Sequence, residues 1–152
     1  MKKYILVVLC MIATLPSLNA QKIEESKVPA VVVKAFKDKF PKMQFVTWSQ
    51  QKGGNYMARF SNAGAPCTMS IDKSGKWIET VRSIPVNTLP DPPKAGIEKN
   101  FSGYSIESVD KVSNEKDIIC YDAKIKKGDS SYSVRMSKTG DVISKTAMGK
   151  KE

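Results

Sequence analysis

The chain has 152 residues, of which 25 are Lys or Arg and 15 are Asp or Glu, so its formal net charge is +10. This length is enough for one sizeable domain or for two small units that share a core. There is no histidine in the sequence, which removes the usual general base, the common proton shuttle and the commonest metal ligand.

Residues 1–20 have the pattern of a secretory signal peptide. Met1-Lys2-Lys3 is positively charged, an apolar run follows as far as Leu15, and the stretch ends in the small residue Ala20. We expect cleavage near Ala20 and a periplasmic or secreted product without a transmembrane segment, because a span needs about 20 apolar residues. Lipidation at Cys10 is the alternative, but Val7-Val8-Leu9 lacks the small residues expected before such a cysteine.

The first half of the remaining chain predicts one helix followed by four strands. Residues 21–27 are polar, and we expect them to form a flexible lead. Apolar side chains from Val28 to Phe40 recur at helical spacing, and Pro41 ends the helix. Alternating segments separated by Gly-containing turns then predict strands over residues 44–49, 55–61, 67–71 and 76–84.

The second half repeats this order after a Pro-rich junction at residues 84–93. A second helix is predicted up to Phe101, and Gly96 lowers its intrinsic stability. Four more strands are predicted over residues 104–113, 118–126, 130–137 and 141–146, and we expect the tail 147–152 to be disordered.

The two halves align with each other, which indicates an internal duplication. The helical residues Val28, Pro29, Phe36 and Phe40 match Leu89, Pro90, Ile97 and Phe101 at an offset of 61 residues. The turn residue Gly75 matches Gly140 at an offset of 65. The sequence therefore predicts an α+β fold in which residues 21–87 and 88–152 each form one helix laid across a four-stranded antiparallel sheet.

Several motifs resemble the PepSY-like periplasmic proteins of Bacteroidetes. They are Val28-Pro29, Phe40-Pro41, Tyr56-x-Ala58-x-Phe60, Asp72-x-x-Gly75-x-Trp77-x-Glu79-Thr80, Leu89-Pro90 and Phe101-x-Gly103-Tyr104-x-Ile106. The resemblance implies a fold like that of the beta-lactamase inhibitor protein. In that fold the two repeats join their sheets into one larger sheet, both helices cover its convex face, and the open face can receive a partner protein. Related PepSY domains occur in peptidase propeptides and are thought to inhibit peptidases.

Strand alternation divides the side chains between the helix side and the open face of the sheet. We expect a bulge at the Gly75 turn to place Trp77 on the helix side, whereas a two-residue turn would send it outward. The open face is predicted to carry Met57, Arg59, Thr68, Ser70, Thr80, Arg82, Cys120, Asp122, Lys124, Ser133, Arg135 and Lys145. The candidate partner-binding residues are Trp48, Met57, Arg59, Arg82, Lys124, Arg135 and Lys145, because Trp and Arg are favoured interface anchors. A plain solvated sheet face is the alternative.

No catalytic, cofactor or metal site is predicted. Alternation places Cys67 on the helix side and Cys120 on the open side, so we expect two free thiols, and no histidine is present to activate either. The acidic residues near 110–122 match no calcium loop.

The sequence therefore predicts a secreted, non-enzymatic binding module. The preferred partner is an envelope protein, with a peptidase as one candidate, bound through the open face. The alternative is a small ligand or an anionic envelope polymer, bound in the cleft or on the basic face between the repeats. Nucleic acid is not an expected partner, because no nucleic-acid motif is present and a secreted protein rarely meets one.

Overall fold

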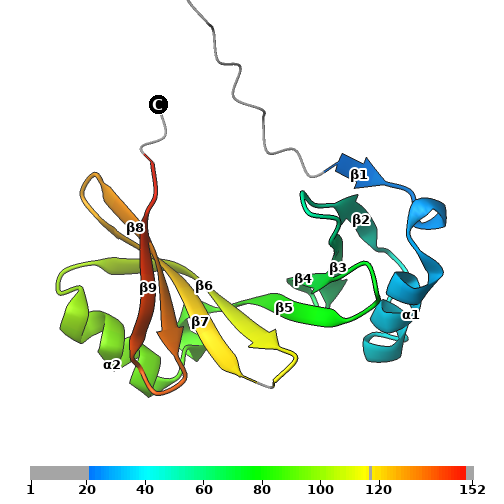
Figure 1. Ribbon diagram of the computed structural model, residues 1–152. Coiled ribbons are helices and arrows are strands. Elements are labelled where there is room, and N and C mark those ends of the chain that lie inside the picture. The colour runs from blue at the N-terminus through cyan, green and yellow to red at the C-terminus, as the bar shows by residue number, and fades with distance from the viewer. Residues whose placement is uncertain (1–20, 117, 150–152) are drawn as a thin grey trace, which may run out of the picture.

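The computed structural model describes residues 21–116 and 118–149, so the predicted signal peptide and the last residues of the predicted tail lie outside the described residues. Two α-helices and a nine-stranded antiparallel sheet make up this part of the chain (Figure 1). The strands lie in the sheet in their sequence order, β1 to β9. The predicted α+β class and the single joined sheet are confirmed.

The first half comprises more regular structure than the sequence predicted. Its elements are β1 (Gln21–Ile23), the 3-10 helix η1 (Glu25–Lys27), α1 (Ala30–Lys39), β2 (Thr47–Gln50), β3 (Tyr56–Asn62), β4 (Ala65–Ile71) and β5 (Trp77–Ile84). The flexible lead predicted over residues 21–27 is wrong. β1 pairs with β2, and the Glu25 carboxylate accepts hydrogen bonds from Lys37 Nζ at 3.0 Å and Trp48 Nε1 at 3.2 Å.

The second half follows the same plan. Its elements are the 3-10 helix η2 (Val86–Thr88), α2 (Asp91–Asn100), β6 (Ser105–Asn114), β7 (Ile119–Lys127), β8 (Ser130–Ser137) and β9 (Val142–Ala147). The predicted disordered tail begins too early, because Ala147 ends β9 and Met148 N–H still donates to the Ser131 carbonyl.

The duplication extends to the segment before each helix. η2 follows η1 at the offset of 61 residues that relates the helices, and Ile84 follows Ile23 at the same offset. Ile23 packs against the first hydrophobic core and Ile84 against the second. The end of β5 therefore packs against the core of the second half in the way that β1 packs against the core of the first half.

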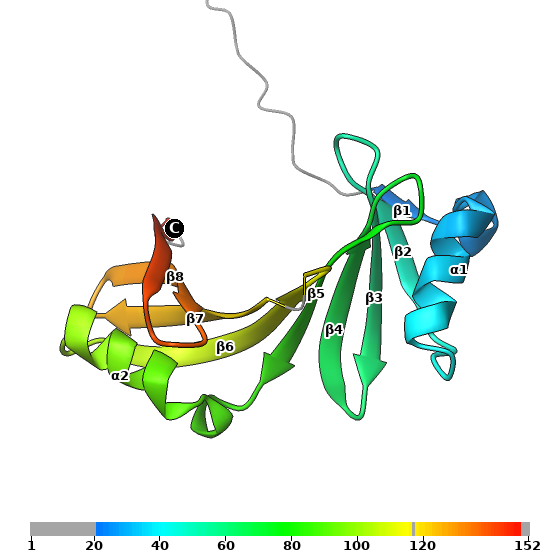
Figure 2. The ribbon, with the colours of Figure 1, turned by 60° about the horizontal axis from the view of Figure 1, so that its bottom comes forward.

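The sheet bends between its two halves, and both helices lie on the outside of the bend (Figure 2). The pairing of β5 with β6 joins the halves into one sheet. Each half has its own core on the helix side, with Phe36 of α1 and Ile97 of α2 both about 1% exposed. One face of the bent sheet thus packs against helices, while the other, which we call the open face, carries no helix from residues 21–116 or 118–149.

A glycine-containing turn of the sheet packs against each helix. Gly75 and Gly140 both have positive φ, at 86° and 92°. In the first turn Asp72 Oδ1 accepts two backbone N–H groups, and in the second the hydroxyl of Ser137 accepts two in the same way. A Cβ at Gly75 would lie 2.7 Å from Val31 Cγ2 of α1, so the turn itself rests on the helix.

A bulge after each of these turns reverses the predicted faces of two charged residues. Trp77 pairs with Ile71 on the helix side, as predicted, and Lys39 Nζ lies 3.4 Å from its ring centroid. The next pair is Ser70 with Glu79, so Ile78 is an extra residue that shifts the alternation. Arg82 consequently pairs with the buried Cys67 and lies on the helix side. Its predicted position on the open face is therefore wrong.

Thr80 is misplaced for the same reason, since it pairs with the buried Met69. In the second half Ile143 is the extra residue, and Lys145 pairs with the buried Val134. The predicted open-face positions of Thr80 and Lys145 are therefore wrong as well.

Trp48 is also on the helix side, contrary to prediction. Its partner across the sheet is Ala58, and its ring meets Phe36 edge to face with centroids 5.5 Å apart. Only 1% of Trp48 is exposed. The indole thus belongs to the core, because β2 begins at Thr47 and its register turns the large side chain towards α1.

Candidate functional site

The open face carries an apolar centre that strand alternation had not revealed. Val81, Val112 and Cys120 lie side by side on β5, β6 and β7. Val112 is only 4% exposed, although it belongs to neither helix-side core. The inside of the bend is thus closely packed at its middle. Val81 is found on this face only after allowing for the bulge at Ile78.

Polar side chains bound this centre on the second half of the sheet. Arg135 binds Asp122 through two parallel hydrogen bonds, Nε to Oδ1 at 2.7 Å and Nη2 to Oδ2 at 2.6 Å. The hydrogen bond with Asp122 raises the pKa of Arg135 above its ordinary value. This pair holds both side chains in a fixed orientation on neighbouring strands.

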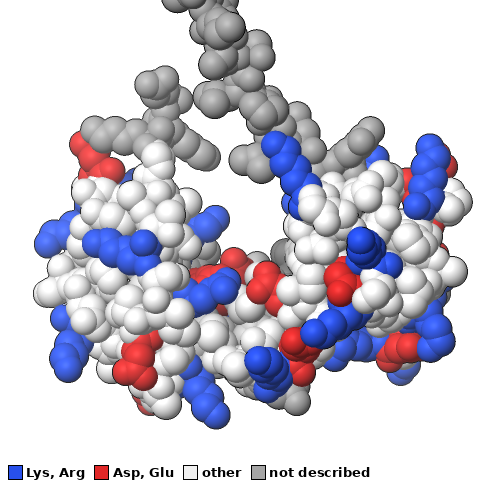
Figure 3. Space-filling view, viewed as in Figure 1, with Lys and Arg blue, Asp and Glu red and all other residues white. Residues whose placement is uncertain are grey.

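A second carboxylate lies beside this pair. Asp110 stands directly across from Asp122 on β6, and the hydroxyl of Ser83 donates to Asp110 Oδ1 at 2.6 Å. Acidic side chains gather in the hollow between the two halves, whereas Lys and Arg are spread over both (Figure 3). The middle of the open face is therefore mixed in charge.

The exposed cations of the open face lie away from its centre. Arg59 on β3 and Lys124 on β7 are both exposed and project from opposite halves of the sheet. Met57 is half-buried on β3, two residues from Arg59. Of the predicted partner-binding residues, these three and Arg135 share the open face.

The other three predicted residues are elsewhere. Trp48 is in the first core, and Arg82 faces a cleft on the helix side. Lys145 Nζ lies 3.8 Å from the ring centroid of Tyr132 and 5.3 Å from that of Phe101. Lys145 thus covers aromatic rings of the second half and is not available to the open face.

Cys67 and Cys120 are free thiols and lie on opposite faces of the sheet, as predicted. Cys67 is buried and pairs with Arg82 on the helix side, while Cys120 is half-buried on the open face. Burial raises the pKa of the Cys67 thiol, and the nearby Arg82 charge opposes this shift. Within residues 21–116 and 118–149, no three acidic or cysteine side chains come close enough together to hold a metal ion.

None of the helices in the described ranges has the length and apolar character needed to cross a bilayer. Solved structures of other proteins share this fold.

A DUF2874 family protein from Bacteroides ovatus superposes with a TM-score of 0.72 at 21% identity, covering 78% of this chain and 86% of that one. A protein from Bacteroides eggerthii, described as a candidate periplasmic protein, gives a TM-score of 0.72 at 18% identity, covering 79% of this chain and 88% of its own. A BLIP-like protein from Bacteroides fragilis gives 0.67 at 17% identity, with 80% and 87% covered. At these identities the likeness establishes the fold.

A search of curated proteins found no match. The family model for beta-lactamase-inhibitor-like, PepSY-like proteins matches the chain twice, over residues 17–71 and 54–144. The two matches overlap at residues 54–71 and together span nearly all of the described chain. The chain belongs to this beta-lactamase-inhibitor-like, PepSY-like family.

Proposed function

We propose that this protein is a non-catalytic binding module of the cell envelope that holds a partner protein on its open face. The observation that carries the proposal is a bent sheet with one uncovered face, whose apolar centre at Val81, Val112 and Cys120 is bordered by oriented charges. An apolar centre with a polar rim is the arrangement found in protein–protein interfaces.

The partner that fits best is an envelope protein with a protruding loop. An apolar side chain at the tip of such a loop would contact Val81 and Cys120, which are half-buried on either side of Val112. Acidic groups beside the tip would meet the exposed side chains of Arg59 and Lys124. Binding of this kind blocks the partner's surface without making or breaking a bond, and a peptidase is the first partner class to test, given the family.

The proposed location follows from the amino terminus. Residues 1–20 have the charged start, apolar run and small end residue of a signal peptide, and one of the structural relatives is described as a candidate periplasmic protein. An exported module would meet envelope proteins directly.

The test is a pull-down from envelope extract with a matched pair of charge reversals. The double variant Arg59→Glu/Lys124→Glu changes the open face, and Lys94→Glu/Lys99→Glu changes exposed positions of α2 by the same charge. We expect one protein to be captured by the wild type and by the α2 variant, to persist at moderate salt, and to be lost with the open-face variant. Equal capture by both variants, or loss of all binding at moderate salt, would contradict the proposal.

A further inference from the structure

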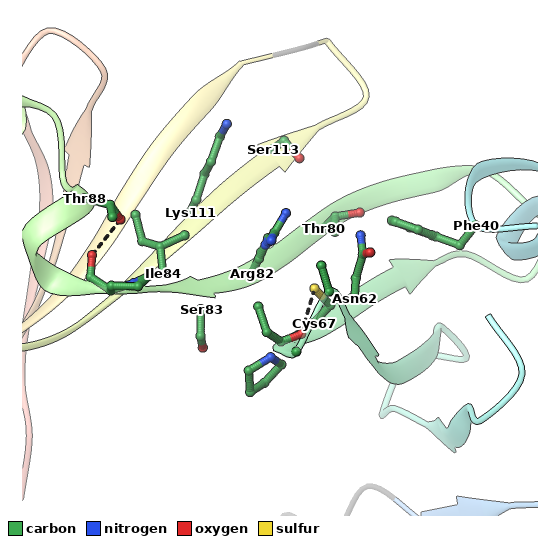
Figure 4. Close-up of a pocket in the computed structure, with 15 residues that line it drawn as sticks. Phe40, Asn62, Cys67, Thr80, Arg82, Ser83, Ile84, Thr88, Lys111 and Ser113 are labelled. Carbon is green, nitrogen blue, oxygen red and sulfur yellow. Dashed lines mark hydrogen bonds between the residues drawn. The ribbon is translucent and has the colours of Figure 1, made fainter. Parts of the chain in front are cut away.

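The middle of the helix side contains a cleft that neither helix covers. It lies over β5 and β6, between the end of α1 and η2, and has a volume of about 910 Å³. Figure 4 shows Arg82, Lys111, Thr80 and Ser113 on the same side of these two strands, with Ser83 pointing the other way. We call this the waist cleft.

Two cations face each other on the floor of the waist cleft. Arg82 of β5 and Lys111 of β6 are direct cross-strand partners. Like charges in this position repel one another and destabilise a sheet. Among the described residues, no carboxylate lines the cleft, and none forms an ion pair with Arg82 or Lys111. The arrangement thus places two positive charges together with no counterion from the described chain.

Hydroxyl groups stand beside the two cations. Thr80 and Ser113 form the next cross-strand pair on the same face. Trp77 Nε1 donates to Thr80 Oγ1 at 3.0 Å, which leaves the Thr80 hydroxyl hydrogen free to donate into the cleft. Asn62 also lines the cleft and adds an amide group. The cleft therefore combines two charged donors with neutral ones, which is the chemistry that binds an oxyanion.

The walls of the cleft add an apolar surface. Phe40 enters from the end of α1 and points towards Arg82 and Thr80, and Ile84 lies at the far end (Figure 4). A volume of this size is typical of small-molecule sites and exceeds what a bare oxyanion needs. A ligand that filled the cleft would need an apolar body as well as a charged head.

We propose that the waist cleft binds a small amphipathic anion, with its phosphate, sulfate or carboxylate head at Arg82 and Lys111 and its apolar body against Phe40. This site is on the opposite side of the sheet from the open face. It is therefore independent of the proposed protein-binding function, and either can fail without the other.

Isothermal titration calorimetry of the purified protein with octyl phosphate tests the proposal. Inorganic phosphate supplies the head without the body, and octyl glucoside supplies the body with a neutral head. We expect octyl phosphate to bind and the other two to bind at least about tenfold more weakly, since a charge-assisted hydrogen bond contributes about 1.5–3 kcal/mol. No binding of octyl phosphate, or equal binding of either comparison ligand, would overturn the proposal.

Variants assign the binding to the cleft. Arg82→Gln/Lys111→Gln should weaken octyl phosphate at least about tenfold, whereas Arg59→Gln/Lys124→Gln on the open face should leave it unchanged. Because the cleft variant removes a repulsive pair, its melting temperature without ligand should not fall, which separates lost binding from lost folding. Arg82→Lys retains the charge and should retain most of the affinity. Undiminished affinity in the cleft variant would refute the assignment.

Discussion

Gly96 lies within α2, where an alanine would ordinarily stabilise a helix, yet the structure predicts the opposite effect. A Cβ atom at Gly96 would collide with the carbonyl oxygen of Gly140 and come within 2.7 Å of the Met136 methyl carbon. The carbonyl is part of the turn between β8 and β9, so relieving the collision requires the whole turn to move away from the helix. We therefore expect Gly96→Ala to destabilise the protein.

Two effects of opposite sign set the magnitude. Alanine is favoured over glycine in a helix interior by about 1 kcal/mol. Overpacking costs about 1–3 kcal/mol. The cost for Gly96→Ala should lie in the upper part of that range, because the added Cβ would collide with backbone atoms, which cannot rotate away as a side chain can. The net loss in the free energy of unfolding should be about 1–2 kcal/mol, which for a domain of this size lowers Tm by about 3–10 °C.

The first half of the chain provides a matched comparison. Ala35 of α1 occupies the position equivalent to Gly96, and Ala35→Gly should cost about 1 kcal/mol through helix propensity. Glycine at position 35 and alanine at position 96 should thus each destabilise the protein, although the two positions are equivalent in the repeat. Urea unfolding followed by far-UV circular dichroism measures both variants. A Gly96→Ala midpoint equal to or above that of the wild type would show that the turn does not press on α2.

Three further predictions concern the first half and the thiols. Phe36→Ala should cost about 3–5 kcal/mol in urea unfolding, because Phe36 is almost fully buried, and a loss below about 1 kcal/mol would mean a loosely packed core. A hydrogen bond from Lys37 is the main cause that lowers the pKa of Glu25 below its ordinary 4.5. The charged Glu25 carboxylate therefore stabilises the fold above about pH 4.5, and this stabilisation is lost as the pH falls through the lower folded-state pKa. The difference in unfolding free energy between wild type and Glu25→Gln should disappear in acid, and a difference that stays constant with pH would contradict this. In residues 21–152, Cys120 should react with a thiol reagent faster than the buried Cys67, so Cys120→Ser should remove the fast phase and leave the slow one.

The order of the elements could be predicted from sequence because each depends on local patterns. Apolar residues at helical spacing marked α1, and the glycine turns marked the hairpins. The faces of Arg82 and Lys145 could not be predicted in this way, because one extra residue in a bulge reverses every position after it. The predicted binding set was therefore partly wrong although the strands were right.

The segment before α1 was missed for a different reason. Residues 21–27 are polar in composition, and three residues of strand are too few for an alternation pattern. The signal that could have revealed β1 was the internal alignment, since Ile23 corresponds to Ile84 at the offset of the helices. The role of Gly96 was also hidden, because its need for close approach to Gly140 arises between residues far apart in sequence.

The sequential strand order has a consequence for how the chain folds. Every strand pairs only with its neighbours along the chain, and the two longest connections, through α1 and α2, each fold on themselves as helices. The loops that must close are therefore short, which keeps the entropy lost at each step small and favours fast folding. A chain that emerges from its amino terminus can add each new strand to an edge that already exists, so the first half can serve as the template on which the second is laid.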